Sequence, residues 1–164
     1  LHNQEVDVYA GGEDDIFVVQ SEIPLSNFTN KNCFNFNTAV VLECKSSIGK
    51  VLSVSAEALI KKAETLDSVV VFEGDVFANA LATLADEPNK FIALSNLETF
   101  REEYEDGNAK KDSLISAYAR VICENVESKL LEENLGLEVS VPVKICYELF
   151  ENKQDGVIKV AIKP

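Results

Sequence analysis

The chain has 164 residues, of which 46% are hydrophobic and 26% charged, a composition typical of soluble globular proteins. This length predicts one domain, residues 1–164, that buries roughly two thirds of its unfolded surface. The formal net charge of −13 argues against a general nucleic-acid coat or a protein that binds anionic membranes, because both need a basic face. No apolar run approaches the roughly 18 residues that cross a bilayer, so we expect no membrane span.

The four cysteines, Cys33, Cys44, Cys123 and Cys146, leave the cellular compartment open. The absence of a Cys-x-x-Cys pair argues against a zinc site. Reduced, buried thiols would fit a cytoplasmic protein, which is our first expectation. Two disulfides would fit a secreted protein, as would the glycosylation motif Asn-Phe-Thr at 27–29. A count of free thiols separates the two: four favour the cytoplasm and none favours secretion.

The first third of the chain predicts a hairpin, a loop and a strand. Residues 5–9 alternate apolar and polar side chains, and the apolar run 16–19 follows a turn that begins with Gly-Gly, so residues 5–23 predict a β-hairpin. The Asn-rich residues 24–37 predict an ordered loop. A strand at 39–44, a helix at 55–66 and a strand at 68–72 follow. This order is typical of a right-handed crossover between two parallel strands.

Helical spacing of apolar residues dominates the next part of the chain. It predicts a helix at 75–86, a short acidic helix from Asn96 to Gly107 and a long helix from Ser113 to Gly136, with a strand at 90–95 between the first two. Residues 137–150 and 157–163 then alternate strictly and predict an antiparallel hairpin. Pro142 cannot donate to a strand ladder, which points to an edge strand or a bulge.

These elements predict an α/β fold: a single domain with a mixed β-sheet flanked by helices and a C-terminal antiparallel hairpin. The core residues that this fold should bury are Val40, Leu42, Leu59, Ile60, Val70, Phe72, Leu81, Ile92, Tyr118, Ile122 and Val141.

The candidate catalytic residues lie at the end of the predicted strand 39–44. Residues two apart in a strand share a face, so Glu43 and Lys45 should project together while Cys44 points away. A carboxylate can bind Mg²⁺ through its oxygens, and the metal lowers the pKa of a bound water. A neighbouring lysine can orient that water. A second carboxylate is normally needed, and Asp7 is the best candidate, so Asp7 and Glu43 are the expected metal ligands.

Two segments resemble the restriction-endonuclease-like PD-(D/E)xK nucleases, and within them the Mrr-like branch. Residues 5–10 (Glu-Val-Asp-Val-Tyr-Ala) look like the family's first acidic strand, and residues 41–45 (Val-Leu-Glu-Cys-Lys) look like its Glu-x-Lys strand. The resemblance covers roughly the first 100 residues. It implies metal-dependent phosphodiester hydrolysis by Asp7, Glu43 and Lys45 with nucleic acid as partner. Residues 20–22 (Gln-Ser-Glu) lie where the family often places its Glu-x-Lys motif, but they lack the lysine. If they are the true equivalent of that motif, the site is inactive.

Charge placement gives the nuclease hypothesis one further feature. The segment from residue 44 to residue 62 contains four lysines and one acidic residue, Glu57, which gives it a formal charge of +3. The alternative is that these lysines are the solvated face of an amphipathic helix. The alternative function is a non-enzymatic acidic α/β module for protein interaction or assembly, in a secreted form if the cysteines are paired. Whether the chain is an enzyme stays open at this point.

Overall fold

The computed structural model describes residues 4–10, 17–23 and 28–151, with side-chain surroundings for residues 31–151. These residues form β-strands and two single-turn 3-10 helices. The strands are β1 (Gln4–Ala10), β2 (Phe17–Ile23), β3 (Phe28–Glu43), β4 (Ile48–Leu66), β5 (Val69–Leu84), β6 (Phe91–Glu105), β7 (Leu114–Val121), β8 (Glu127–Leu130) and β9 (Gly136–Phe150), and the turns are η1 (Cys123–Asn125) and η2 (Glu132–Asn134).

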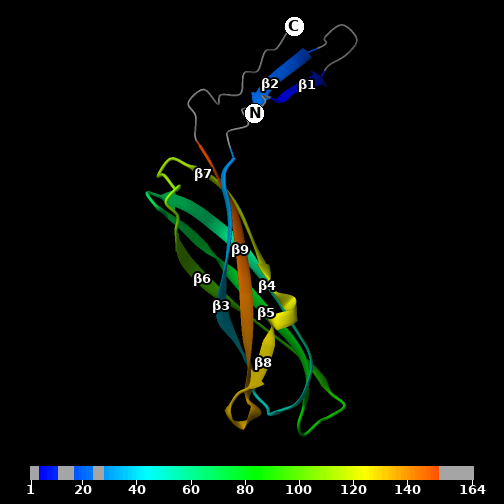
Figure 1. Ribbon diagram of the computed structural model, residues 1–164. Coiled ribbons are helices and arrows are strands. Elements are labelled where there is room, and N and C mark those ends of the chain that lie inside the picture. Colours follow the sequence, from blue (N-terminus) through cyan, green and yellow to red (C-terminus); the bar gives the residue numbers. More distant parts are fainter. Residues whose placement is uncertain (1–3, 11–16, 24–27, 152–164) are drawn as a thin grey trace.

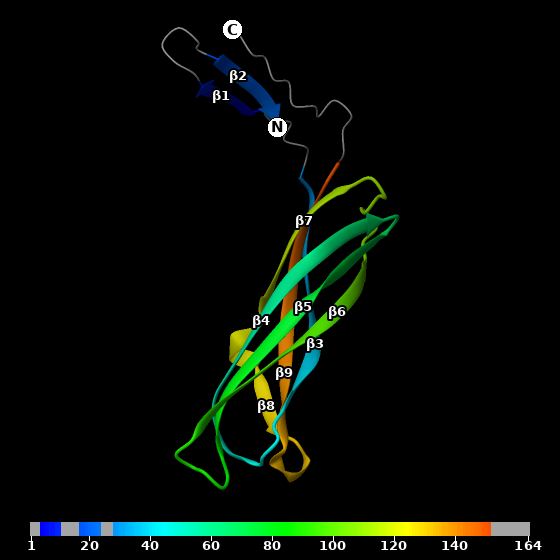
Figure 2. The ribbon, with the colours of Figure 1, turned by 180° about the vertical axis from the view of Figure 1, so that it is seen from behind.

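Two antiparallel sheets pack face to face as a β-sandwich (Figure 1). One sheet has the order β3-β9-β7, with the short β8 also paired to β9. The other is the meander β4-β5-β6, which lies in front when the molecule is seen from behind (Figure 2). β1 and β2 form a separate antiparallel pair, as the sequence predicts for residues 5–23.

Alternation of side chains builds the core between the sheets. In β9, every second residue from Leu137 to Leu149 is buried. In β5, the buried inner row runs from Val70 through Phe72 to Ala82. Successive side chains of a strand point to opposite faces, so each strand gives one row to the core and one row to an outer face.

The predicted α/β fold is wrong, because the described residues contain no α-helix. The predicted helices at 55–66, 75–86, 96–107 and 113–136 are instead parts of β4, β5, β6 and the β7–η2 segment. The predicted loop at 24–37 is also wrong from Phe28 onward, where β3 begins. Strand 137–150 is confirmed as β9, while its predicted partner 157–163 lies outside the described residues.

The predicted parallel crossover is wrong as well. Residues 39–44 end β3 in one sheet, whereas residues 68–72 begin β5 in the other. Every strand pair among the described residues is antiparallel. The α/β arrangement that the nuclease resemblance implies is therefore not the arrangement of these strands.

Pro142 lies in the middle strand of its sheet and not on an edge strand. On one side Asn37 of β3 is its partner, and on the other its carbonyl oxygen accepts a hydrogen bond from Ile122 N–H at 3.0 Å. Ile122 lies just past β7, where the η1 turn separates β7 from β8. Pro142, which has no N–H to donate, thus lies opposite the η1 turn, where β7 has ended and β8 has not begun. At this position the missing N–H costs the sheet no hydrogen bond between strands.

About half of the predicted core is confirmed. Val40, Leu42, Val70, Phe72 and Val141 are fully buried. Ile60, Ile92 and Ile122 are half-buried. Leu59, Leu81 and Tyr118 are wrong predictions, because they point outward and are exposed. Since Leu59 is 54% exposed, its truncation to alanine should cost less than about 1 kcal/mol, not the 2–5 kcal/mol of a core leucine.

A buried hydrogen-bond network joins the β6–β7 turn to β9. The Tyr147 hydroxyl donates to Asp106 Oδ2 at 2.6 Å, and the Asn32 amide donates to the same oxygen at 3.0 Å. Burial, followed by the bond to Asp106, raises the pKa of Tyr147 well above its usual value. The folded state therefore favours the neutral phenol.

Tyr147→Phe is expected to lower the free energy of unfolding by about 1.5–3 kcal/mol at neutral pH, because the buried carboxylate of Asp106 loses a donor. The raised pKa also fixes the pH dependence. The wild type keeps this contribution below the unfolded tyrosine pKa of about 10 and loses it as the pH rises toward the folded value. Urea denaturation from pH 7 to pH 11 should therefore show the gap between wild type and variant closing at alkaline pH. A gap independent of pH would contradict this assignment.

Candidate functional site

Glu43 and Lys45, the residues predicted from the Glu-x-Lys pattern, lie at the end of β3 and in the bend that follows it. Both side chains are exposed and line one open depression of about 510 Å³, together with Glu132 of η2 and the apolar Leu131 and Leu135. Cys44 between them is partly buried and packs against the hydrophobic core, as expected for a side chain that points away from those of Glu43 and Lys45. The strand itself ends at Glu43.

Asp7, the other predicted metal ligand, lies in β1 and pairs with Gln20 of β2. Its side chain lies outside the part of the chain whose side chains are described, so its convergence with Glu43 stays a prediction. Within residues 31–151, no three His, Cys, Asp or Glu side chains are grouped so that they could hold a metal ion. The Mg²⁺ hypothesis therefore rests on the sequence pattern alone.

The predicted lysine patch is spread along a strand. Lys50 lies near the start of β4 and Lys61 near its end. Eleven residues of strand span roughly 36 Å, so these charges cannot act as one phosphate-binding patch. Lys62 pairs with Glu64 at 3.4 Å, and Lys61 pairs with Asp75 at 2.6 Å.

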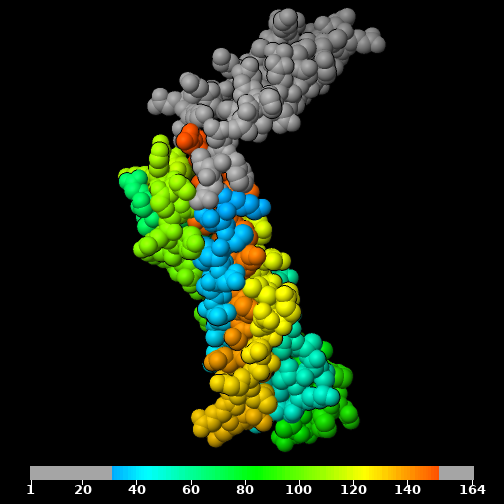
Figure 3. Space-filling model, viewed as in Figure 1, coloured from blue at the N-terminus to red at the C-terminus, as the bar shows by residue number. Residues whose placement is uncertain are grey.

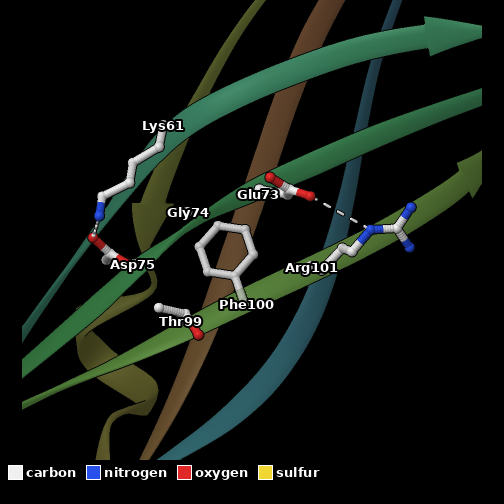
Figure 4. Close-up of a pocket in the computed structure, with 7 residues that line it drawn as sticks. All are labelled: Lys61, Glu73, Gly74, Asp75, Thr99, Phe100 and Arg101. Atoms are coloured by element: carbon white, nitrogen blue, oxygen red, sulfur yellow. Dashed lines mark ion pairs between the residues drawn. The ribbon is translucent and has the colours of Figure 1, made fainter.

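A second depression, of about 460 Å³, lies over the outer face of the β4-β5-β6 sheet (Figure 4). Asp75 of β5 is only 1% exposed there, although it points away from the core. One of its carboxylate oxygens, Oδ2, forms an ion pair with the ammonium group of Lys61. The other oxygen, Oδ1, is buried without a hydrogen-bond partner among the described residues. A buried carboxylate oxygen without a donor costs free energy, so this site is the strongest polar anomaly of the described residues.

The backbone around Asp75 is shaped to produce this arrangement. The β4–β5 register shifts between Ile60 and Lys62, so Lys61 is an extra residue that turns toward Asp75. Gly74 lies opposite the shift, and the Phe100 ring occupies the space where a side chain would stand (Figure 4). β-bulges commonly re-aim a side chain beside a functional site.

A second ion pair closes the other side of this depression. Arg101 Nε lies 3.6 Å from Glu73 Oε1. Arg101 also donates from Nη1 to Glu103 at 2.5 Å, and this hydrogen bond, with the charge of Glu103, raises the pKa of Arg101. The guanidinium of Arg101 is thus already paired with two carboxylates, those of Glu73 and Glu103. Asp75 is paired with Lys61 instead.

The outer face of the β4-β5-β6 sheet carries several large apolar side chains. Phe77 and Leu97 are direct cross-strand partners, and both are exposed. Leu81 faces Ala93 in the same way. The large apolar side chains of this face that are between 37% and 65% exposed include Leu59, Phe77, Leu81, Phe91 and Leu97. We call these five residues the apolar face.

The outer face of the other sheet is different. Figure 3 shows this side, where β3, β9 and β8 lie next to one another. Its outward rows in β3 and β9 carry mostly polar residues, such as Asn35 and Asn37 beside Lys144. Leu114 and Tyr118 of the edge strand β7 are its exposed large apolar residues, each at 55%. The two outer faces of the sandwich are therefore chemically distinct.

Sequence reasoning missed the Asp75 site and the apolar face, because both follow from β4, β5 and β6 being strands. Comparison of the chain with models of known protein families, with curated proteins and with solved structures found no match.

Proposed function

We propose that this chain is a non-enzymatic protein-binding module, and that it binds its partner through the outer face of the β4-β5-β6 sheet. The observation that carries the proposal is the apolar face itself. Several large apolar side chains are exposed on this one face, and two of them, Phe77 and Leu97, are direct cross-strand partners. Adjoining exposed apolar residues are typical of interaction surfaces. Aromatic residues such as Phe77, with neighbouring aliphatic ones, form the centre of many interfaces.

The occupant is a different protein and not a second copy of the chain. Each copy carries a formal net charge of −13, so two copies repel one another, whereas a basic partner is attracted. On the other sheet the outward rows of β3 and β9 are mostly polar, which favours an apolar contact on the β4-β5-β6 side of the sandwich.

The compartment proposed for this module is an oxidising one. The structure contains one disulfide, Cys33–Cys146, and two free cysteines, Cys44 and Cys123. It therefore matches neither the four thiols nor the two disulfides of the two sequence-based alternatives. Stable disulfides persist mainly outside the cytoplasm, which supports secretion over our first expectation. Residues 4–10, 17–23 and 28–151 include no helix long and apolar enough to span a membrane.

The test is a selection of binders from a displayed library of random linear peptides. We expect apolar peptides that bind the wild type, and we expect Leu59→Ser to weaken them by about tenfold, equivalent to ~1.4 kcal/mol. Leu114→Ser is a matched control, because Leu114 also lies on an edge strand and is 55% exposed, against 54% for Leu59, but faces out from the other sheet. The control should bind like the wild type.

Three outcomes would overturn this proposal. Equal losses in Leu59→Ser and Leu114→Ser, or no selected peptide at all, would remove the β4-β5-β6 face as the binding surface. A dimer in sedimentation equilibrium that Leu59→Ser dissociates would assign the face to a second copy of the chain. Neither substitution should prevent folding, because both side chains are about half exposed.

The metal-dependent nuclease hypothesis stays a prediction with a direct test. It requires Asp7 and Glu43 to bind one divalent cation, with Lys45 beside it. MgCl₂ or MnCl₂ should then raise the melting temperature of the wild type, and Glu43→Gln should abolish the increase, because a ligand that binds only the folded state stabilises it. Glu57→Gln serves as the control for the loss of one acidic charge. A melting temperature that does not respond to either metal would contradict the hypothesis.

A further inference from the structure

The ion pair between Lys61 and Asp75 joins two very differently placed groups. The side chain of Asp75 is 2% exposed, whereas that of Lys61 is 60% exposed. The carboxylate is therefore fixed in the sheet, while the ammonium reaches it from solvent at the end of a flexible stem. Lys61 can leave Asp75 without any change in the backbone.

Lys61 also satisfies only half of the carboxylate. Its Nζ lies 2.6 Å from Oδ2, and Oδ1 has no donor among the described residues. An ammonium acts as a point charge, whereas a guanidinium is a planar fork whose two N–H groups match both oxygens of a carboxylate. Asp75 is thus paired with a ligand that fits it less well than an arginine would.

The surroundings of Asp75 connect it to the apolar face. Its direct cross-strand partners are Leu59 on β4 and Thr99 on β6. Phe77 and Leu97, the central pair of the apolar face, lie two residues further along the same strands. A partner that packs on Phe77 and Leu97 would therefore place its next side chain over Asp75.

We propose that Asp75 is the polar anchor of this surface and receives an arginine side chain of the partner protein, which displaces Lys61. This inference rests on the proposed function and adds the chemistry of the partner: an apolar segment that carries an arginine. The guanidinium binds both carboxylate oxygens, and Oδ1 gains the donor that it lacks in the free protein. A buried, bidentate pair next to apolar contacts is a common form of binding hot spot.

Methylguanidinium chloride is the first probe, titrated at constant ionic strength and followed by amide NMR. We expect saturable shifts at Gly74, Asp75 and Thr99, and smaller ones with methylammonium, which lacks the fork. Lys61→Gln should tighten methylguanidinium binding about threefold or more, because the competing cation is removed. Lys62→Gln is the matched control, since Lys62 is 62% exposed, pairs with Glu64 and should leave the affinity unchanged.

Asp75→Asn, which keeps the shape of the side chain, should abolish the methylguanidinium shifts. Shifts that persist in Asp75→Asn, equal effects of Lys61→Gln and Lys62→Gln, or equal affinities for methylguanidinium and methylammonium would each overturn the inference. If Asp75→Asn fails to fold, the comparison of the two lysine variants still decides.

The second probe is a peptide selected on the wild type as described above. Replacing its arginine by lysine should weaken binding about tenfold to the wild type and have little effect on Asp75→Asn. The contrary outcome is a peptide that binds the apolar face with an affinity that changes neither when its arginine is replaced by lysine nor when Asp75 is replaced by asparagine. Such a peptide would overturn the arginine anchor and leave the proposed function intact. Failure to select any peptide would overturn the proposed function, and the methylguanidinium titration would then decide separately whether Asp75 is a guanidinium site.

Discussion

Replacement of Gly74 by alanine is expected to destabilise the protein by about 3 kcal/mol. A β-carbon at this position would lie 2.1 Å from the backbone carbonyl oxygen of Leu59 and 2.6 Å from the Phe100 ring. The ring can shift, but the carbonyl belongs to the β4 strand at its register shift and cannot move without breaking the ladder. Urea denaturation of the purified variant measures the loss.

Gly107→Ala is the matched control for this substitution. Gly107 lies in the β6–β7 turn, and no atom approaches its β-carbon position within 4 Å. The same chemical change should therefore alter the free energy of unfolding by less than about 0.5 kcal/mol. Equal stabilities of Gly74→Ala and Gly107→Ala would contradict the close packing of β4, β5 and Phe100 on which the Asp75 site depends.

Loss of the Cys33–Cys146 disulfide is the second large expected effect. The bond joins directly paired residues of β3 and β9 that are 113 positions apart in the sequence. Closing so long a loop restricts the unfolded chain strongly, so the double variant Cys33→Ala, Cys146→Ala should lose about 2–5 kcal/mol. Denaturant unfolding of the wild type with and without reductant should show a loss of the same size.

Thiol chemistry supplies the controls for this prediction. The unreduced, denatured protein should react with two equivalents of a thiol reagent, from Cys44 and Cys123, and with four after reduction. Cys123→Ala removes an exposed free thiol and should leave the stability unchanged within about 0.5 kcal/mol. Four reactive thiols before reduction would contradict the disulfide and favour the cytoplasmic alternative.

The sequence predicts the strands that alternate without interruption. Residues 5–9 and 137–149 show a period of two, and both segments lie in strands. β4 does not show this alternation, because its pairing register with β5 shifts between Val51 and Ser53 and again between Ile60 and Lys62. Each shift adds a residue, so the inward side chains change from odd to even positions at the first shift and back to odd at the second, and the spacing resembles that of a helix. Alanines at inward positions strengthen the impression of a helix.

The outer apolar face adds a second source of error. In β5 and β6, large side chains such as Phe77, Leu81 and Leu97 point away from the core. With both faces apolar in part, the alternation of these strands is hidden, and propensity then favours helices. The residues that carry the proposed function are thus the residues that obscure the fold.

The candidate site could be predicted only in part. The Glu-x-Lys pattern does bring Glu43 and Lys45 to one depression, because residues near a strand end stay close along the chain. Asp75 carries a usable signal, since aspartate is uncommon inside strands. In the sequence it looks like the start of a helix, and its ion pair depends on a bulge in β4 that no local pattern reveals.

β9 is the last of the described strands along the chain and also the middle strand of its sheet. During synthesis, β3, β7 and β8 have no pairing partner until residues 136–150 emerge, because each of them hydrogen-bonds to β9 and not to the others. The β4-β5-β6 meander can pair as soon as it is made. The inner apolar row of this sheet therefore stays exposed to solvent until β9 has been synthesised. A newly made chain is most prone to aggregate during this period. Arrival of β9 should set the folding rate, and pairing across such long sequence separations is slow.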